Sequence, residues 1–142
     1  MREALAEGRK ALPACLPNPP VGCVLVRDAR VIARGFTQAP FLQHAEAMAL
    51  SQLTGSAAGV CAYVTLEPCS FHGRTPSCAH ALVTAGIARV VVGILDPDPR
   101  NNGAGVQVLI SAGVEVVIGV LASEAHRDLD PYLGLAANRA EG

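Results

Sequence analysis

The hydrophobic pattern alternates between short strand-like runs and helix-like segments along most of the chain. Apolar runs rich in β-branched residues predict strands over 21–26, 31–33, 61–66, 89–95 and 114–120. Segments of good helix formers predict helices over 3–12, 44–53, 77–85 and 106–112. Ser123 is expected to cap a last helix, which is interrupted near Pro131. The runs over 89–95 and 114–120 are typical of strands buried on both faces.

This alternation predicts one α/β sheet covered by helices on both faces. The first two strands flank the polar segment 27–30 and are expected to pair as a hairpin, whereas the later strands should run parallel. We therefore expect a three-layer α/β/α sandwich around a five-stranded mixed sheet. In such sheets a ligand binds beyond the carboxyl ends of the strands, where loops lead into helix N-termini.

Length and composition fit a single domain over residues 1–142. Hydrophobic residues make up 51% of the 142 residues and charged residues 16%, so the chain is too apolar to be disordered. No apolar run approaches the length that spans a bilayer, and we expect no membrane partner. A net charge of −1, with only two tyrosines and three phenylalanines, offers no general surface for nucleic acid.

The first residues and the cysteines bear on the cellular compartment. Residues 1–10 lack the continuous apolar core of a secretory signal, which favours the cytoplasm. Five cysteines are an odd number, and outside the secretory pathway they favour free thiols or metal ligands over a disulfide framework. Cys23 and Cys61 fall in predicted strands and are interpreted as core residues, whereas Cys15 is expected to be exposed.

Two short segments at strand-to-helix junctions carry the residue types of a catalytic metal site. One is His44-Ala45-Glu46, and the other runs from Glu67-Pro68-Cys69 to Cys78. One imidazole and two thiolates suit tetrahedral zinc with the fourth position left to water, whereas a structural site normally has four protein ligands. Residues two apart on a helix point in different directions, so His44 can hold zinc while Glu46 exchanges protons with the metal-bound water.

The same segments resemble a known family of deaminases. Histidine-x-glutamate, followed by proline-cysteine and a second cysteine, is similar to the zinc-dependent cytidine/deoxycytidylate deaminase superfamily. Eight residues separate the two cysteines, and the stretches 65–70 and 73–76 look like the deaminase domain of the bifunctional riboflavin-biosynthesis deaminase/reductase. Segments 18–24 and 96–99 match that domain too, so the resemblance covers about residues 1 to 130.

This resemblance implies a cytidine-deaminase-like fold and assigns roles to individual residues. It implies that the zinc ligands are His44, Cys69 and Cys78, and that the proton shuttle is Glu46. It further implies that the substrate contacts are Asn18, Ser70, Arg74 and Asp96. The position of Arg74 faces the substrate phosphate in the family, and a guanidinium beside a helix N-terminus suits that role.

Several residues in loops expected to face the substrate depart from the family pattern. None of them is a metal ligand, and they are Thr37, residues 41–43, Phe71, Ser77 and Ala104. Thr37 and Phe71 stand where the family usually has histidine. These departures leave the zinc chemistry intact and leave the substrate open, and the reductase domain is expected to be absent.

We predict a zinc-dependent hydrolytic deaminase of a small aminated heterocycle, expected to be phosphorylated: a diaminopyrimidine, a pterin-like compound or a pyrimidine nucleotide. Zinc hydroxide would attack the amine-bearing carbon, Glu46 would protonate the ring nitrogen, and ammonia would leave. Two alternatives stay open at this point, a stand-alone tailoring deaminase of a specialised metabolite and a non-catalytic ligand-binding protein on a deaminase scaffold. We also expect a homo-oligomer, because alanine-rich helices such as Ala45–Leu50 suit close packing.

Overall fold

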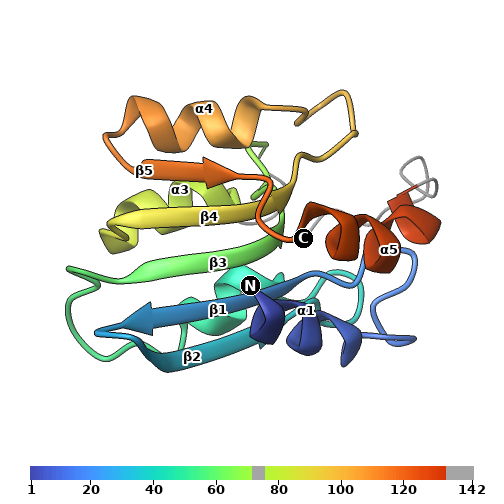
Figure 1. Cartoon of the computed structure of the whole chain (residues 1–142), viewed down its shortest axis with the longest axis horizontal. Coiled ribbons are helices and arrows are strands. Elements are labelled where there is room, and N and C mark those ends of the chain that lie inside the picture. The colour runs from blue at the N-terminus through green and yellow to red at the C-terminus, as the bar shows by residue number, and fades with distance from the viewer. Residues whose placement is uncertain (72–75, 134–142) are drawn as a thin grey trace.

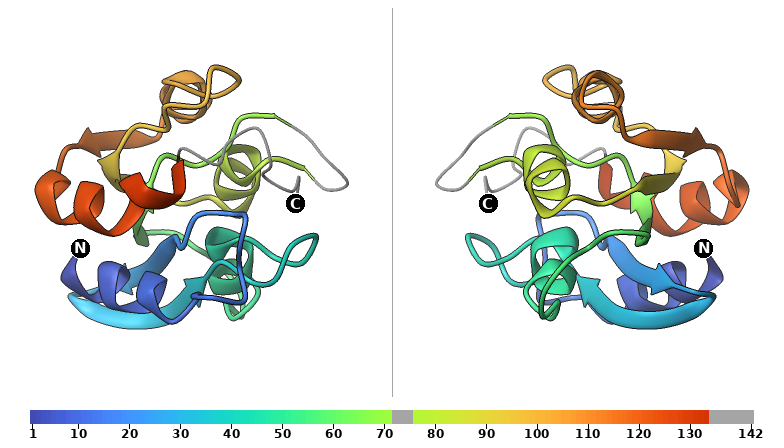
Figure 2. Two further views of the ribbon diagram at one scale, coloured as in Figure 1. Left: turned by 90° about the vertical axis from the view of Figure 1, so that its right-hand side faces the viewer. Right: turned by 90° about the vertical axis from the view of Figure 1, so that its left-hand side faces the viewer.

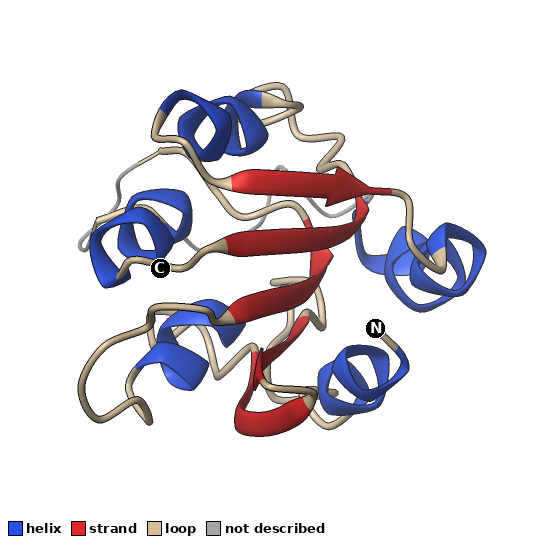
Figure 3. Cartoon of the chain, turned by 60° about the vertical axis from the view of Figure 1, so that its left-hand side comes forward, coloured by secondary structure: helices blue, strands red, loops and turns tan. Residues whose placement is uncertain are grey.

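The computed structural model describes residues 1–71 and 76–133 and places one sheet between two layers of helices (Figure 1). The strands are β1 (Gly22–Arg27), β2 (Arg30–Phe36), β3 (Cys61–Leu66), β4 (Arg89–Ile94) and β5 (Glu115–Ile118). The helices are α1 (Arg2–Arg9), α2 (Ala45–Leu50), α3 (Cys78–Ala85), α4 (Ala104–Ser111) and α5 (Ala122–Leu133). Helices α2, α3 and α4 cover one face, and α1 and α5 cover the other (Figure 3). The predicted three-layer sandwich is confirmed.

The sheet is mixed, and its strand order is β2-β1-β3-β4-β5. Strand β1 pairs antiparallel with β2 and with β3, whereas β3, β4 and β5 run parallel to one another. Both the hairpin and the parallel later strands follow the prediction. The end-on views of Figure 2 show α1 and α5 together on one side of the sheet. The chain reaches the carboxyl ends of β3 and β4 just before the segments that carry Cys69 and Asp96.

The hydrophobic core lies between the sheet and both helical layers. Strand β4 is buried from Val90 to Ile94, as its almost continuous apolar run predicts. Leu82 of α3 and Leu109 of α4 pack into this core from one face, and Leu129 of α5 packs from the other. Within the described ranges, none of the helices has both the length and the apolar character needed to cross a membrane.

Strand β5 differs from its prediction in burial and in length. It spans only Glu115–Ile118, and none of its residues is buried. The reason is its place in the sheet: β5 is an edge strand, so one side has no neighbouring strand. An apolar run alone cannot tell an edge strand from a central one, and Ile118 stays 47% exposed.

Helix ends and one cysteine also differ from the predictions. Helix α1 ends at Arg9 rather than at 12, because a run of turns leads into Pro13. Helix α5 begins at Ala122, so Ser123 lies inside it rather than at its cap, and the helix continues through Pro131 to Leu133. Cys15 is fully buried, and the expectation that it is exposed is wrong.

Helix α2 lies unusually close to the sheet, and Gly35 of β2 makes this approach possible. A Cβ atom at Gly35 would lie 2.1 Å from the carbonyl oxygen of Ala45 and 2.8 Å from the amide nitrogen of Ala49. Only a hydrogen atom fits in that space. The close approach fixes the start of α2, next to His44 and Glu46, against the sheet.

Candidate active site

The three predicted metal ligands come together at the N-terminal ends of two helices. His44 is the residue before α2, Cys78 is the first residue of α3, and Cys69 lies in the loop after β3. The Nδ1 atom of His44 lies 3.3 Å from the Sγ atom of Cys78 and 4.0 Å from that of Cys69. All three ligand atoms lie within 4.8 Å of one another. In the described part of the chain this is the one group of three such side chains that could hold a metal ion.

The donor set fits zinc. One imidazole nitrogen and two sulfur atoms can be the three protein ligands of a tetrahedral zinc site that leaves its fourth position to water. The backbone N–H of Cys78 donates to the sulfur of Cys69 over 3.2 Å, which favours a thiolate at the N-terminus of α3. A hydrogen bond with the Cys78 thiol, opposed by burial, lowers the pKa of Cys69 to about 4. The same bond, together with burial, raises the pKa of Cys78, so zinc binding has to displace that proton.

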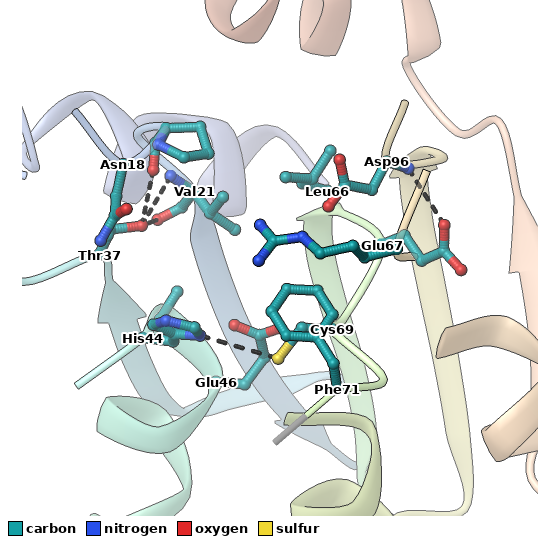
Figure 4. A pocket seen from close by; sticks show the side chains of 13 residues that line it. Asn18, Val21, Thr37, His44, Glu46, Leu66, Glu67, Cys69, Phe71 and Asp96 are labelled. Atoms are coloured by element: carbon teal, nitrogen blue, oxygen red, sulfur yellow. Dashed lines mark hydrogen bonds between the residues drawn. The ribbon is translucent and has the colours of Figure 1, made fainter. Parts of the chain in front are cut away.

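Glu46 lies in the first turn of α2, beside the metal-binding atoms (Figure 4). Its side chain is buried, with 4% of the residue exposed. Burial raises the pKa of the Glu46 carboxyl to about 7, and His44 partly offsets this effect. A carboxyl group in this position can take up or release a proton inside the cavity.

A cavity extends from the metal-binding atoms along the carboxyl ends of the strands. Its lining includes His44, Glu46, Cys69, Asn18 and Asp96. Asn18 is 5% exposed, and its Oδ1 atom is the one buried side-chain nitrogen or oxygen in the described residues that lacks a hydrogen-bond partner. An unpaired buried acceptor costs about 1–3 kcal/mol, so a ligand that donates to Asn18 would recover this energy.

The other two expected substrate contacts have different outcomes. Ser70 is half-buried and is not among the residues that line this cavity; its backbone N–H donates to the side-chain oxygen of Asn101. Arg74 lies outside the described residues.

The residues that depart from the family pattern divide into two groups. Thr37 and Phe71 line the cavity, as expected. The Thr37 hydroxyl donates to the carbonyl oxygen of Pro19 (2.9 Å) and accepts from the N–H of Val21 (3.0 Å), so it holds the segment that carries Asn18 (Figure 4).

The remaining departures do not face this cavity. Ser77 caps α3 by accepting the N–H of His80, and Ala104 is the exposed first residue of α4. Residues 41–43 line a second, mostly apolar cavity of about 880 Å³ over α2 and α3. The expectation that all of these residues lie in substrate-facing loops is therefore wrong for Ser77 and Ala104.

Two polar residues near the cavity were not predicted from the sequence. The buried Glu67 carboxylate accepts three backbone N–H groups, those of Asp96 (3.1 Å), Gly103 (2.9 Å) and Val106 (3.0 Å). It thereby ties the loop after β3 to the loop after β4. Arg100 follows β4 and lines the cavity. The only feature of the sequence that could have indicated a role for Arg100 in the site is its place four residues after Asp96.

Fold and site together define the class of protein. An α/β/α sandwich that places a histidine and two cysteines at helix N-termini, with a buried glutamate beside them, has the parts of a zinc-dependent hydrolase. Residues 1–94 match the family model of the cytidine and deoxycytidylate deaminase zinc-binding region. The chain belongs to this family.

Relatives of known name agree with this assignment. The riboflavin biosynthesis protein RibD of Escherichia coli (strain K12) is 49% identical over 111 residues, which cover 78% of this chain and 30% of that protein. The solved structure of Acinetobacter baumannii RibD, form 2, superposes with a TM-score of 0.88 at 44% identity, covering 94% of this chain and 38% of that chain.

A third relative carries a more specific name. It is a Thermotoga maritima protein described as a diaminohydroxyphosphoribosylaminopyrimidine deaminase/5-amino-6-(5-phosphoribosylamino)uracil reductase. Its structure has a TM-score of 0.89 at 37% identity and covers 97% of this chain and 40% of that chain. The chain spans about a third of the length of the curated relatives it matches.

Proposed function

We propose that this chain is a zinc-dependent deaminase that removes an amino group from a phosphorylated pyrimidine by hydrolysis. The observation that carries the proposal is the buried carboxylate of Glu46 beside the sulfur and nitrogen atoms of the zinc ligands. A purely structural metal site would not require Glu46, because burying a carboxylate next to two cysteines costs stability. A deaminase needs a proton carrier at this place.

The roles of the residues follow from their positions. When bound by His44, Cys69 and Cys78, zinc would supply an activated water for attack on the ring carbon that carries the amino group. Glu46 would carry one proton of that water to the ring nitrogen and the other, from the hydroxyl group then on the ring carbon, to the leaving amine. The carbon–nitrogen bond breaks, a carbonyl group forms, and ammonia leaves.

The substrate contacts are proposed from the cavity and from the family resemblance. The unpaired Oδ1 of Asn18 would accept a hydrogen bond from the substrate, and Asp96 would face its polar edge. Ser70 and Arg74 are proposed as substrate contacts from the family resemblance alone. In this proposal Arg74 contacts the phosphate. The name of the Thermotoga maritima relative suggests the compound, a diaminohydroxyphosphoribosylaminopyrimidine.

We further propose that the chain is a single deaminase domain that works in the cytoplasm as a homo-oligomer. Support for the oligomer comes from Phe41 and Leu42, which are 55% and 61% exposed beside the apolar cavity over α2 and α3. A second copy covering this surface would bury both side chains. Light scattering that gives the mass of a monomer at micromolar concentration would refute the oligomer.

The test of the main proposal is ammonia release by the zinc-loaded chain. The panel contains nucleobases, nucleosides, pyrimidine nucleotides and the diaminopyrimidine phosphate named above. Glu46→Gln should retain stoichiometric zinc and lose at least about 100-fold in kcat, the usual contribution of a general acid–base group. Glu115→Gln, at an exposed glutamate on β5, should leave both unchanged. No ammonia from any compound, or full activity of Glu46→Gln, would refute the proposal.

A further inference from the structure

A cation rests on an aromatic ring at the wall of the metal-site cavity. The guanidinium carbon of Arg100 lies 4.4 Å from the centroid of the Phe71 ring, and both residues line the cavity. This distance is within the range of a cation–π interaction. Phe71 follows Cys69 by two residues and Arg100 follows Asp96 by four, so the pair joins the loops that carry a metal ligand and a proposed substrate contact.

Asp98 binds the same guanidinium group. The Nη2 atom of Arg100 lies 2.8 Å from Oδ2 of Asp98, and Nε lies 3.2 Å from Oδ1 and 3.3 Å from Oδ2. The Asp98 side chain is only 4% exposed, and its Oδ1 also accepts the backbone N–H of Arg100. The backbone N–H of Asp98 in turn donates to Asp96, so hydrogen bonds within residues 96–100 position the arginine.

The side chains that line the cavity are mostly acidic where they are charged, and Arg100 is the basic exception among the described ones. Glu46, Glu67 and Asp96 line it, and a phosphorylated ligand entering among these carboxylates would meet like charge. Among the lining residues in the described part of the chain, Arg100 is the only arginine or lysine. A guanidinium has five N–H donors, so it can hold Asp98 and also donate to an oxyanion of a ligand.

We propose that Arg100 binds the anionic group of the substrate and sets the preference for a phosphorylated over an uncharged compound. Asp98 and Phe71 position it for this role. The proposal rests on the proposed deaminase function and adds a specificity residue to it. The role of Arg100 is inferred from its contacts with Phe71 and Asp98, whereas the role expected for Arg74 comes from the family resemblance.

The experiment measures deamination of two compounds by the zinc-loaded chain: the diaminopyrimidine phosphate and the same compound after removal of its phosphate. Ammonia release by the unaltered protein comes first, because its absence with both compounds would refute the deaminase function before any variant is made. Given that activity, Arg100→Gln should lower the ratio of the two kcat/KM values by about tenfold or more, mainly through KM for the phosphorylated compound.

Arg89→Gln is the matched control. Arg89 begins β4, the strand that Arg100 follows, and its side chain is 44% exposed against 42% for Arg100. The ratio of the two kcat/KM values should not change in this variant. An unchanged ratio in Arg100→Gln would overturn the proposal. Equal losses of kcat for both compounds would also overturn it, because they indicate a residue that only supports the cavity.

A second variant and measurement cover the case in which Arg100→Gln does not fold. Arg100→Lys keeps the charge but loses the planar fork that grips two oxygens at once. Inorganic phosphate should inhibit the unaltered protein competitively, and its inhibition constant should rise several-fold in Arg100→Lys. Equal inhibition constants in the two proteins would overturn the proposal.

Discussion

The carboxylate of Glu67 is predicted to hold the active-site loops together, and Glu67→Gln tests this role. Its Oε1 atom accepts the N–H groups of Asp96 and Gly103, and its Oε2 atom accepts that of Val106. All three donors belong to the segment from the end of β4 to the first turn of α4. Glutamine has nearly the same shape, so the substitution leaves no cavity and changes only charge and hydrogen bonding.

The expected cost follows from the three bonds. The amide oxygen of the introduced glutamine can replace only one carboxylate oxygen, and its NH₂ group then meets a backbone N–H instead of accepting from it. One charge-assisted bond, worth about 1.5–3 kcal/mol, is lost, and two more weaken to the neutral value of about 1 kcal/mol each. We expect a fall of at least about 3 kcal/mol in the free energy of unfolding.

Urea and thermal unfolding of the zinc-loaded proteins measure this change. A loss of about 3 kcal/mol should lower the melting temperature by roughly 6–12 °C in a chain of this length. Glu115→Gln is the control, because Glu115 is 69% exposed and only forms a 3.8 Å ion pair with Arg89. Its expected cost is within about 1 kcal/mol.

A result for Glu67→Gln that matches the control would refute the reasoning. It would mean that the three N–H groups find water or other acceptors once the charge is gone, and that the loops do not depend on Glu67. Retained stability together with weaker zinc binding would also contradict it, because it would mean that Glu67 affects the metal site without holding the loops together.

Three further predictions concern the metal, the cavity and the position of α2. Chelation of zinc should lower the urea midpoint and zinc addition should restore it, since a ligand at 100 times its Kd adds about 2.7 kcal/mol; identical midpoints would contradict a folded-state zinc site. Asn18→Ala should stay within about 1 kcal/mol of the parent in stability while kcat/KM falls about tenfold, because it removes a buried acceptor that has no partner in the free protein. Gly35→Ala should cost about 1–3 kcal/mol and weaken zinc binding, because the new methyl group collides with Ala45. Ile32→Ala, at an exposed position of the same strand, should do neither.

The zinc ligands were predictable because their signal is local. His44 and Cys78 stand at the starts of helix-forming segments, and Cys69 follows a buried strand, so each position can be read from a few neighbouring residues. The strands of a parallel sheet then bring such positions to one edge. The fold class was predictable for the same reason, since alternating strands and helices leave few arrangements.

The features that were missed depend on residues far apart in the chain. The apolar run over 114–120 does not reveal that β5 has a neighbour on one side only, and nothing near Cys15 reveals that it is covered. Glu67 and Arg100 each look like ordinary loop charges. Their partners lie 29 to 39 residues away for Glu67 and, for the ring beneath Arg100, in the loop after β3.

Net charge, for the same reason, says little about what this site binds. Four of the twelve acidic residues, Glu46, Glu67, Asp96 and Asp98, are buried together at the carboxyl ends of β3 and β4 and the start of α2. A buried carboxylate persists only when donors or cations compensate it. Backbone N–H groups compensate Glu67, the N–H of Asp98 and the side-chain amide of Asn101 donate to Asp96, and Arg100 compensates Asp98. This leaves Glu46 to the metal centre. A chain that is almost neutral as a whole therefore builds a strongly polar site, and Arg100 is the residue that we propose binds the anionic group of the substrate there.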